Sequence, residues 1–129
     1  MVRKVLVPCA GLGTRFLPVT KVVPKELLPL GSRPAIDYIL DECISSDIEQ
    51  IGIIISEHKK ALLDYLQPDR QLSQRVRGAE ARALLDDLDV VHGRVEVTPL
   101  YQERALGLGH AVSLGREFVG AEFFGVCLP

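Results

Sequence analysis

The chain has 129 residues, of which 47% are hydrophobic and 25% charged, a composition typical of one globular domain with a hydrophobic core. Its formal net charge of -2 creates no long-range field that would attract nucleic acid or an anionic membrane. The 3 cysteines form no C-x-x-C pair, which argues against a zinc site or a disulfide framework, and no apolar run approaches the roughly 20 residues of a membrane span, so a cytoplasmic protein is expected.

Four short apolar runs have the composition of β-strands. They span residues 2–8, 51–56, 94–100 and 123–129, and most are nearly continuous, as strands covered on both faces tend to be. Helical patterns alternate with these runs along the chain. Because strands that alternate with helices form parallel sheets with helical crossovers, we expect an α/β fold with a mostly parallel sheet and no internal domain boundary.

The clearest helical pattern spans residues 34–46, where apolar side chains recur at three- and four-residue steps after a proline suited to a first helical turn. One face of this helix is expected to pack on the sheet. A second candidate helix spans 58–67 and ends before a proline. A third candidate, 109–118, is weakened by Gly115.

The segment 69–89 is polar and of mixed charge, and its composition favours helix, with Leu84, Leu85 and Leu88 on one side. Two interpretations are open for this segment. We favour a solvated helical connection, and the alternative is a surface for a partner protein.

The first predicted strand leads directly into "PCAGLGTR", residues 8–15. Ligands of parallel sheets bind beyond the carboxyl ends of the strands, so this loop lies where a ligand is expected. Gly11 and Gly13 allow the backbone to approach a ligand closely, with successive N–H groups converging on phosphate oxygens. Thr14 adds a hydroxyl donor and Arg15 a planar guanidinium suited to phosphate. The pattern favours a phosphate-binding loop, although a pair of glycines can also form a plain strand-to-helix turn.

Several prolines between residues 18 and 29 fix φ, and they predict a stiff extended segment that carries Lys21 and Lys25 back past the glycine loop. Cations held rigidly beside backbone donors are what a polyphosphate leaving group requires. Two better-known phosphate loops do not match. A Walker loop lacks its G-K-[ST] here, and Phe16 occupies the third glycine position of a dinucleotide-binding fingerprint.

The stretch "AGLGTRFLPVTKVVPKELLPL", followed much later by "QERALGLGHAV", resembles the bacterial UTP–glucose-1-phosphate uridylyltransferases, also called UDP-glucose pyrophosphorylases. The first motif is typical of sugar nucleotidyltransferases in general, and "GLGHAV" narrows the resemblance to the uridylyltransferase branch. Only the segment 69–89 matches weakly. The resemblance implies a Rossmann-like nucleotidyltransferase fold, of which residues 1–129 would be the N-terminal nucleotide-binding part.

The resemblance also implies roles for residues of the first motif. Ala10, Gly11 and Gly13 would give backbone contacts to the nucleotide, while Thr14 and Arg15 would face its phosphates. These assignments agree with the phosphate-binding loop that the residue types favour on their own.

Three further residues take roles from the resemblance. Lys25, in "PKE", matches the family lysine that binds phosphate at the reacting centre. Gln102 matches the glutamine that recognises the uracil edge, and Gly107 the glycine that lets the base lie against the backbone. Without the resemblance, Gln102 would be an ordinary polar residue after a strand.

The family reaction transfers a uridylyl group from UTP to glucose 1-phosphate and gives UDP-glucose and pyrophosphate. The resemblance implies Arg15 and Lys25 as catalytic residues, Mg²⁺ as cofactor and a homo-oligomer at full length. Two alternatives are open: a nucleotidyltransferase for another sugar 1-phosphate or for dTTP, and a catalytically inactive nucleotide-binding or regulatory module.

The family pattern continues with a magnesium-binding aspartate directly after the position of Pro129, so no metal ligand is assigned within this chain. We expect residues 1–129 alone to be inactive, as part of a longer enzyme or as a shortened relative. The run 123–128 is expected in a central strand, and an open edge there predicts aggregation or self-association.

Other polar residues receive weaker expectations. Cys9 is expected to pack in the loop, with a redox-sensitive thiol as the alternative. His92 is expected at the surface, and His110 is expected to cap or pack against a helix start. Glu26 is expected either to pair with Lys25 or to lie in water.

Overall fold

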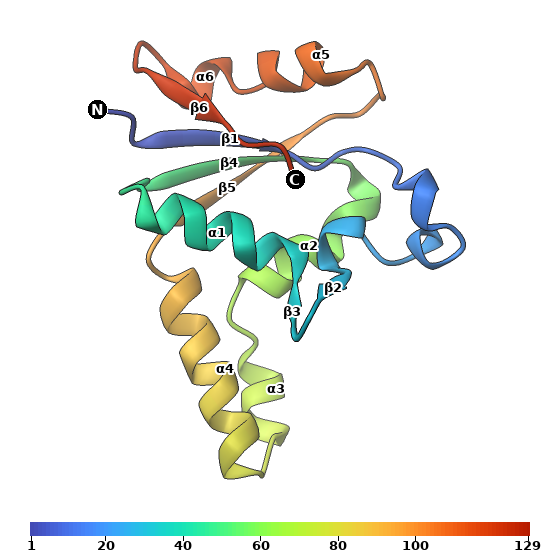
Figure 1. Cartoon of the computed structure of the whole chain (residues 1–129), viewed down its shortest axis with the longest axis vertical. Coiled ribbons are helices and arrows are strands. Elements are labelled where there is room, and N and C mark those ends of the chain that lie inside the picture. Colours follow the sequence, from blue (N-terminus) through green and yellow to red (C-terminus); the bar gives the residue numbers. More distant parts are fainter.

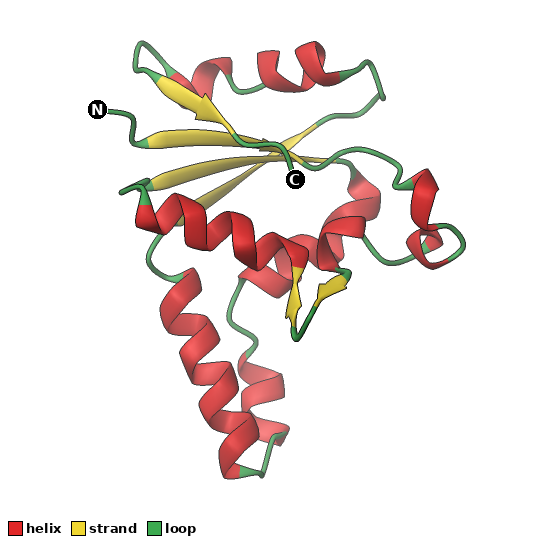
Figure 2. Cartoon of the chain, viewed as in Figure 1, coloured by secondary structure: helices red, strands yellow, loops and turns green.

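A four-stranded parallel sheet forms the centre of the computed structural model, which describes residues 1–129 (Figures 1 and 2). The strand order is β5-β4-β1-β6. The strands are β1 (Lys4–Pro8), β4 (Gln50–Ile55), β5 (Glu96–Tyr101) and β6 (Phe124–Val126). Each overlaps an apolar run predicted as a strand, with ends that differ by up to three residues, and the α/β fold class is confirmed.

Helices cover both faces of this sheet (Figure 1). On one face lie α1 (Ala35–Ser45) and α2 (Lys60–Leu66), and on the other lie α5 (Leu108–Ser113) and α6 (Arg116–Val119). None of the helices combines the length and the apolar character needed to cross a membrane.

Burial on both faces explains why the strand sequences are continuously apolar. Val5 and Val7 of β1 pack in the larger core cluster with Ile36 and Leu40 of α1. Leu6, between them, points to the other face and packs with residues of α5 and α6. Because successive side chains of a strand point to opposite faces, a strand covered on both sides must be apolar at every position.

The helix predicted over 34–46 is α1, which begins one residue later than expected. Pro34 belongs to β3 (Arg33–Pro34), which forms a small antiparallel hairpin with β2 (Pro29–Leu30), a feature that the sequence analysis did not predict. Ile36, Leu40 and Cys43 of α1 are buried, as their spacing predicted.

The polar segment after α2 forms two helices, α3 (Arg70–Arg75) and α4 (Ala79–His92), that project from the body as a hairpin (Figure 1). A solvated helical connection was the favoured interpretation, and the exposed surfaces of both helices agree with it. The three leucines do not share one environment, however. Leu84 is 71% exposed, whereas Leu85 and Leu88 are half-buried.

A buried polar cluster holds the base of α4 to the body. The Nε2 of His92, the last residue of α4, lies 3.3 Å from Oδ1 of Asp37, and the Tyr65 hydroxyl donates to Oδ2 of Asp37 at 2.8 Å. Burial and then the hydrogen bond to Asp37 raise the pKa of Tyr65, so the phenol stays protonated and remains a donor. The expectation that His92 is exposed was wrong, because α4 returns to the core at this residue.

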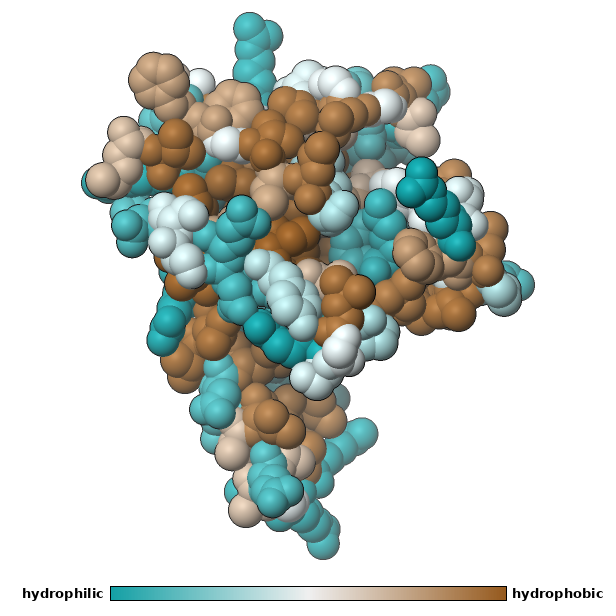
Figure 3. All heavy atoms as spheres, in the orientation of Figure 1, coloured by the Kyte–Doolittle hydropathy of each residue, from teal (hydrophilic) through white to brown (hydrophobic).

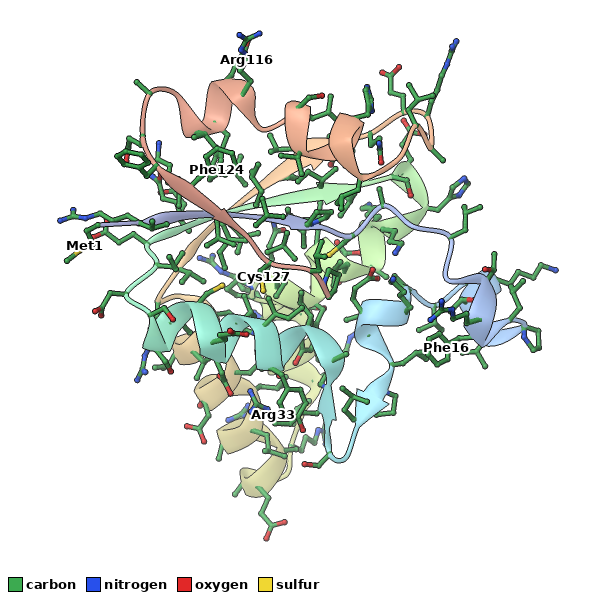
Figure 4. The ribbon with its side chains drawn as sticks, turned by 45° about the horizontal axis from the view of Figure 1, so that its top comes forward. Met1, Phe16, Arg33, Arg116, Phe124 and Cys127 are labelled. Carbon is green, nitrogen blue, oxygen red and sulfur yellow. The ribbon has the colours of Figure 1, made fainter.

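The strand β6 pairs only with β1 and lies at the edge of the sheet that residues 1–129 form, so the open edge expected for this run is present. Large apolar side chains are exposed along this part of the chain, and Phe123 is 83% exposed. Apolar surface is visible in this upper part of the molecule (Figure 3), where Figure 4 labels Phe124. The expected self-association of the chain stays a prediction.

The helix predicted over 109–118 is interrupted where α5 ends and α6 begins, next to Gly115. The side chain of Leu6 is fully buried against this glycine, and a Cβ added to Gly115 would lie 2.6 Å from Cδ2 of Leu6. Gly52 of β4 also leaves space for the Leu6 side chain, since a Cβ added to Gly52 would lie 2.8 Å from Cδ2 of Leu6. Two glycines thus let Leu6 pack tightly between the sheet and the α5–α6 layer.

We predict that Gly115→Ala lowers the free energy of unfolding by about 1–3 kcal/mol, because the added methyl group overpacks the site of Leu6. Urea denaturation followed by circular dichroism measures this change. Gly109→Ala in α5 is the matched control, because a Cβ there meets no atom within 4 Å. Equal stability of the two variants would contradict the packing argument.

Candidate functional site

The predicted site residues lie in loops at one end of the sheet. The glycine loop follows β1, Gln102 follows β5, and both strands end at this edge because the sheet is parallel (Figure 1). The loop also reaches out past the sheet to Phe16, labelled in Figure 4. Residues that are far apart in sequence therefore meet beyond the carboxyl ends of the strands.

The segment after the glycine loop is not extended as predicted. It forms three single 3₁₀ turns, Thr14–Phe16, Val19–Lys21 and Lys25–Leu27, and Pro18 and Pro24 directly precede the second and third. Fixed φ at a proline is as compatible with the start of a turn as with extended chain, which is why the sequence did not distinguish them.

These turns carry Lys25 back to the glycine loop, as predicted. A Cβ at Gly11 would lie 4.0 Å from the Nζ of Lys25, so the ammonium group lies close to the loop backbone. Gly13 adopts a φ of 65°, and its carbonyl accepts a hydrogen bond of 2.6 Å from the Thr20 hydroxyl. A side chain at Gly13 would be strained and would crowd Thr20 at 3.1 Å.

An open cavity of about 930 Å³ lies beside this loop. Gly11, Gly13, Thr14, Arg15 and Lys25 all line it. The side chains of Thr14 and Arg15 are exposed, so their donors are available to a ligand. The structure therefore brings together the residues predicted to contact phosphates.

A second cavity, of about 300 Å³, adjoins the first. Ala10, Gly11, Lys25, Gln102 and Gly107 are among its lining residues. Gly11 and Lys25 thus line both cavities, and Lys25 stands at their junction. The arrangement has the form of one elongated site, with cationic and backbone donors at one end and an amide side chain at the other.

The Gln102 side chain is held in place by groups of the following loop. Its Nε2 donates to the carbonyl oxygen of Gly107 at 3.3 Å and lies 3.0 Å from Nδ1 of His110. Gly107 has a φ of 92° and a ψ of 176°, a conformation essentially confined to glycine. No atom lies within 4 Å of the position that its Cβ would occupy, which leaves a flat, open stretch of backbone.

Glu26 and Lys59 form a buried ion pair that the sequence analysis missed. The Nζ of Lys59 donates to both carboxylate oxygens of Glu26 at 2.9 Å, and the two side chains are 7% and 1% exposed. Neither expectation for Glu26 was right, since it contacts neither Lys25 nor bulk water. The partner lies 33 residues away in the chain, and no spacing rule connects them.

Cys9 is fully buried below the glycine loop. Burial, and next the Glu26 carboxylate, raise the pKa of its thiol. Because the thiolate is the reactive form, this environment favours the packing role over a redox-sensitive thiol.

No group of three or more histidine, cysteine or acidic side chains is positioned to hold an ion. Glu26 is the acidic residue among those that line the two cavities, and Lys59 occupies both of its oxygens. We assign no chemical step in this chain to a metal.

Comparison with known proteins identifies relatives along nearly the whole chain. Residues 4–129 match the family described as Nucleotidyl transferase. The chain is 39% identical to a UTP–glucose-1-phosphate uridylyltransferase of Bacillus subtilis (strain 168), an alignment that covers 98% of this chain and 44% of the relative.

Solved structures that are similar to the chain also include proteins of this kind. A UTP-bound UGPase from Acinetobacter baumannii is 37% identical with a TM-score of 0.92, covering 100% of this chain and 46% of that one. A UDP-glucose pyrophosphorylase complexed with UDP-glucose is 33% identical with a TM-score of 0.82, covering 99% of this chain and 46% of that one. The chain therefore spans about half the length of the relatives it matches.

We predict that Lys59→Met lowers the free energy of unfolding by about 3–5 kcal/mol, because it leaves the Glu26 carboxylate buried without a partner. Urea denaturation measures the loss. Arg3→Met is the matched control, since the Arg3–Glu49 pair has 56% and 61% exposed side chains and exposed pairs contribute about 0–1 kcal/mol.

A double variant, Lys59→Met with Glu26→Leu, should recover much of the lost stability, because no uncompensated charge remains. If Lys59→Met were no more destabilising than Arg3→Met, the buried pair would contribute no more to stability than an exposed one.

Proposed function

The chain belongs to the nucleotidyl transferase family, and on that premise we propose that it supplies the nucleotide-binding part of a UTP–glucose-1-phosphate uridylyltransferase. The observation that carries the proposal is the pair of adjoining cavities. One is lined by Arg15, Thr14 and the glycine loop, the other by Gln102 and Gly107, and Lys25 lies between them. This order matches the order of triphosphate and base in a nucleotide.

The phosphate end of the proposed site acts through charge and backbone donors. The loop amides at Ala10, Gly11 and Gly13 and the hydroxyl of Thr14 would donate to phosphate oxygens. The Arg15 guanidinium would bind the β- and γ-phosphates, and the Lys25 ammonium would lie near the α-phosphate because it stands at the junction of the cavities. Such preorganised donors stabilise charge without reorganising during the reaction.

The proposed reaction is an in-line displacement. A phosphate oxygen of glucose 1-phosphate forms a bond to the α-phosphorus of UTP as the bond from that phosphorus to the bridging oxygen breaks. UDP-glucose forms, and the leaving oxygen departs on pyrophosphate with its electron pair. Lys25 would hold the attacking and transferred phosphates together, and Arg15 would stabilise the pyrophosphate.

Magnesium belongs to the proposal only as the cofactor that the family resemblance implies. When bound, it would neutralise part of the negative charge of the phosphates. Glu26, the acidic residue that lines the proposed site, is already bound by Lys59. A homo-oligomer and a cytoplasmic location likewise stay predictions.

Isothermal titration calorimetry tests the proposal on the chain itself. We expect heat of binding with magnesium UTP and a weaker signal with magnesium tripolyphosphate, which contacts the phosphate end alone. Tighter binding of dTTP than of UTP would favour a thymidylyl-transferring enzyme, and the absence of heat with every nucleoside triphosphate would remove the proposal.

We predict that Arg15→Ala and Lys25→Ala each weaken UTP binding about tenfold or more, because each removes a charge-assisted contact to phosphate. If the two substitutions are made in a form of the protein that catalyses pyrophosphate release from UTP and glucose 1-phosphate, each should lower its turnover about 100-fold or more. Calorimetry and a pyrophosphate-release assay measure the two effects.

Arg116→Ala and Lys60→Ala are the matched controls. Arg116 lies on the outer surface of α6, far from the glycine loop (Figure 4), and Lys60 is exposed at the start of α2. Loss of affinity in the controls equal to that in Arg15→Ala and Lys25→Ala would show a nonspecific charge effect instead of a defined site.

We predict that Gln102→Ala reduces the preference for UTP over other nucleoside triphosphates while tripolyphosphate binding is unchanged, because the amide lies only at the base end. Competition of each triphosphate with UTP measures the preference. An unchanged preference would mean that the base is recognised by other residues.

A further inference from the structure

The orientation of the Gln102 amide follows from the atoms that surround it. The carbonyl oxygen of Gly107 can only accept a hydrogen bond, so the group facing it at 3.3 Å must be the NH₂ of Gln102. The amide oxygen would face the same carbonyl if the amide were turned over, which places two acceptors together. The backbone at Gly107 thus selects one of the two amide orientations.

His110 completes this selection. Its Nδ1 lies 3.0 Å from the same Nε2 of Gln102. Because the NH₂ group offers only donors, Nδ1 must carry a lone pair, and the imidazole must be neutral with its proton on Nε2. The two N–H bonds of the Gln102 amide are then both used, one by Gly107 and one by His110.

The consequence is that the Gln102 side chain has only an acceptor left to offer to a ligand. Its Oε1 accepts no hydrogen bond within the chain, and no buried side-chain oxygen or nitrogen lacks a partner. The oxygen must therefore be accessible, although the residue as a whole is only 6% exposed. Gln102 lines the cavity of about 300 Å³ together with Ala10 and Gly107, where the proposed function places the base, and it also lines a neighbouring cavity of about 540 Å³ with His58 and Tyr101.

We propose that His110 is a positioning residue for base specificity: it holds the Gln102 amide so that the site accepts a ring N–H and rejects an unprotonated ring nitrogen. This inference rests on the proposed function. Uracil has N3–H and donates to Oε1, whereas the unprotonated N3 of cytosine would face the oxygen as a second acceptor. With cytosine bound, Oε1 would be buried without a hydrogen-bond donor, and this cost makes the binding of cytosine much weaker than that of uracil.

Thymine shares the N3–H edge with uracil, so His110 does not separate UTP from dTTP. The discriminated pair is UTP against CTP, whose pyrimidine rings have nearly the same size and differ in the hydrogen-bonding edge. This pair isolates the role of the amide orientation from that of the shape of the cavity.

Calorimetric titration of the chain with magnesium UTP, CTP and tripolyphosphate tests the proposal in three proteins. The wild type should prefer UTP to CTP. His110→Leu should lower this preference about tenfold, the effect of one lost hydrogen bond of the stronger kind, because only the 3.3 Å contact to the Gly107 carbonyl then holds the amide in its orientation. His110→Asn is the matched control, since its Oδ1 is bonded to Cγ as Nδ1 is and can accept from Gln102. It should restore most of the preference.

Tripolyphosphate affinity is the readout that distinguishes a positioning role from general damage to the fold. It should be the same in all three proteins, because the phosphate end does not include His110. Equal loss of tripolyphosphate and UTP binding in His110→Leu, or full UTP preference in that variant, would overturn the proposal.

The outcomes also separate this inference from the proposed function. No binding of any triphosphate by the wild type would end the proposed function itself. Tripolyphosphate and nucleotide binding with no preference between UTP and CTP would leave the phosphate site standing and overturn the role of His110.

A measurement on the wild type alone keeps the proposal testable if a variant does not fold. Nitrogen-15 NMR of the His110 ring should show the neutral tautomer with the proton on Nε2. A proton on Nδ1 would place two donors together at 3.0 Å and would overturn the proposal.

Discussion

Lys59 reaches from the turn before α2 to Glu26 and binds both carboxylate oxygens at 2.9 Å, almost out of contact with solvent. Charges removed from water in this way are tolerated only when the geometry is good, so the pair permits few positions for the turn that contains Glu26. Lys25 is the preceding residue in the same turn. The position of the Lys25 ammonium, 4.0 Å from a Cβ at Gly11, thus depends on a contact between other side chains.

The site also depends on how the parallel sheet is built. The β1–β4 and β4–β5 pairings bring the ends of β1 and β5 to one edge, so the glycine loop and Gln102 leave the sheet on the same side. Leu6 packs against Gly52 and Gly115 and holds the α5 and α6 layer against that sheet. His110 is in α5, so this packing also sets the distance from its imidazole to the Gln102 amide.

Much of the fold was predictable because local patterns of apolar residues indicate its strands and helices. Apolar runs mark strands covered on both faces, and the spacing of Ile36, Leu40 and Cys43 marks α1. Two predictions were wrong for physical reasons, namely the extended segment after the glycine loop and the exposure of His92. The prolines were compatible with both extended chain and turns, and the 3₁₀ geometry of Lys25–Leu27 was decided by its contacts. The buried state of His92 depends on Asp37, which is 55 residues away in the chain.

The sequence by itself determined the parallel α/β order and the glycine loop after the first strand, because each is a property of neighbouring residues, whereas Gln102 and Gly107 were indicated only by the family resemblance. The tertiary structure alone decided that Glu26 pairs with Lys59, that Lys25 stands where two cavities meet, and that Gln102 turns its oxygen outward. These features are contacts between distant segments, and a contact of that kind has no periodicity or spacing that a linear sequence can display.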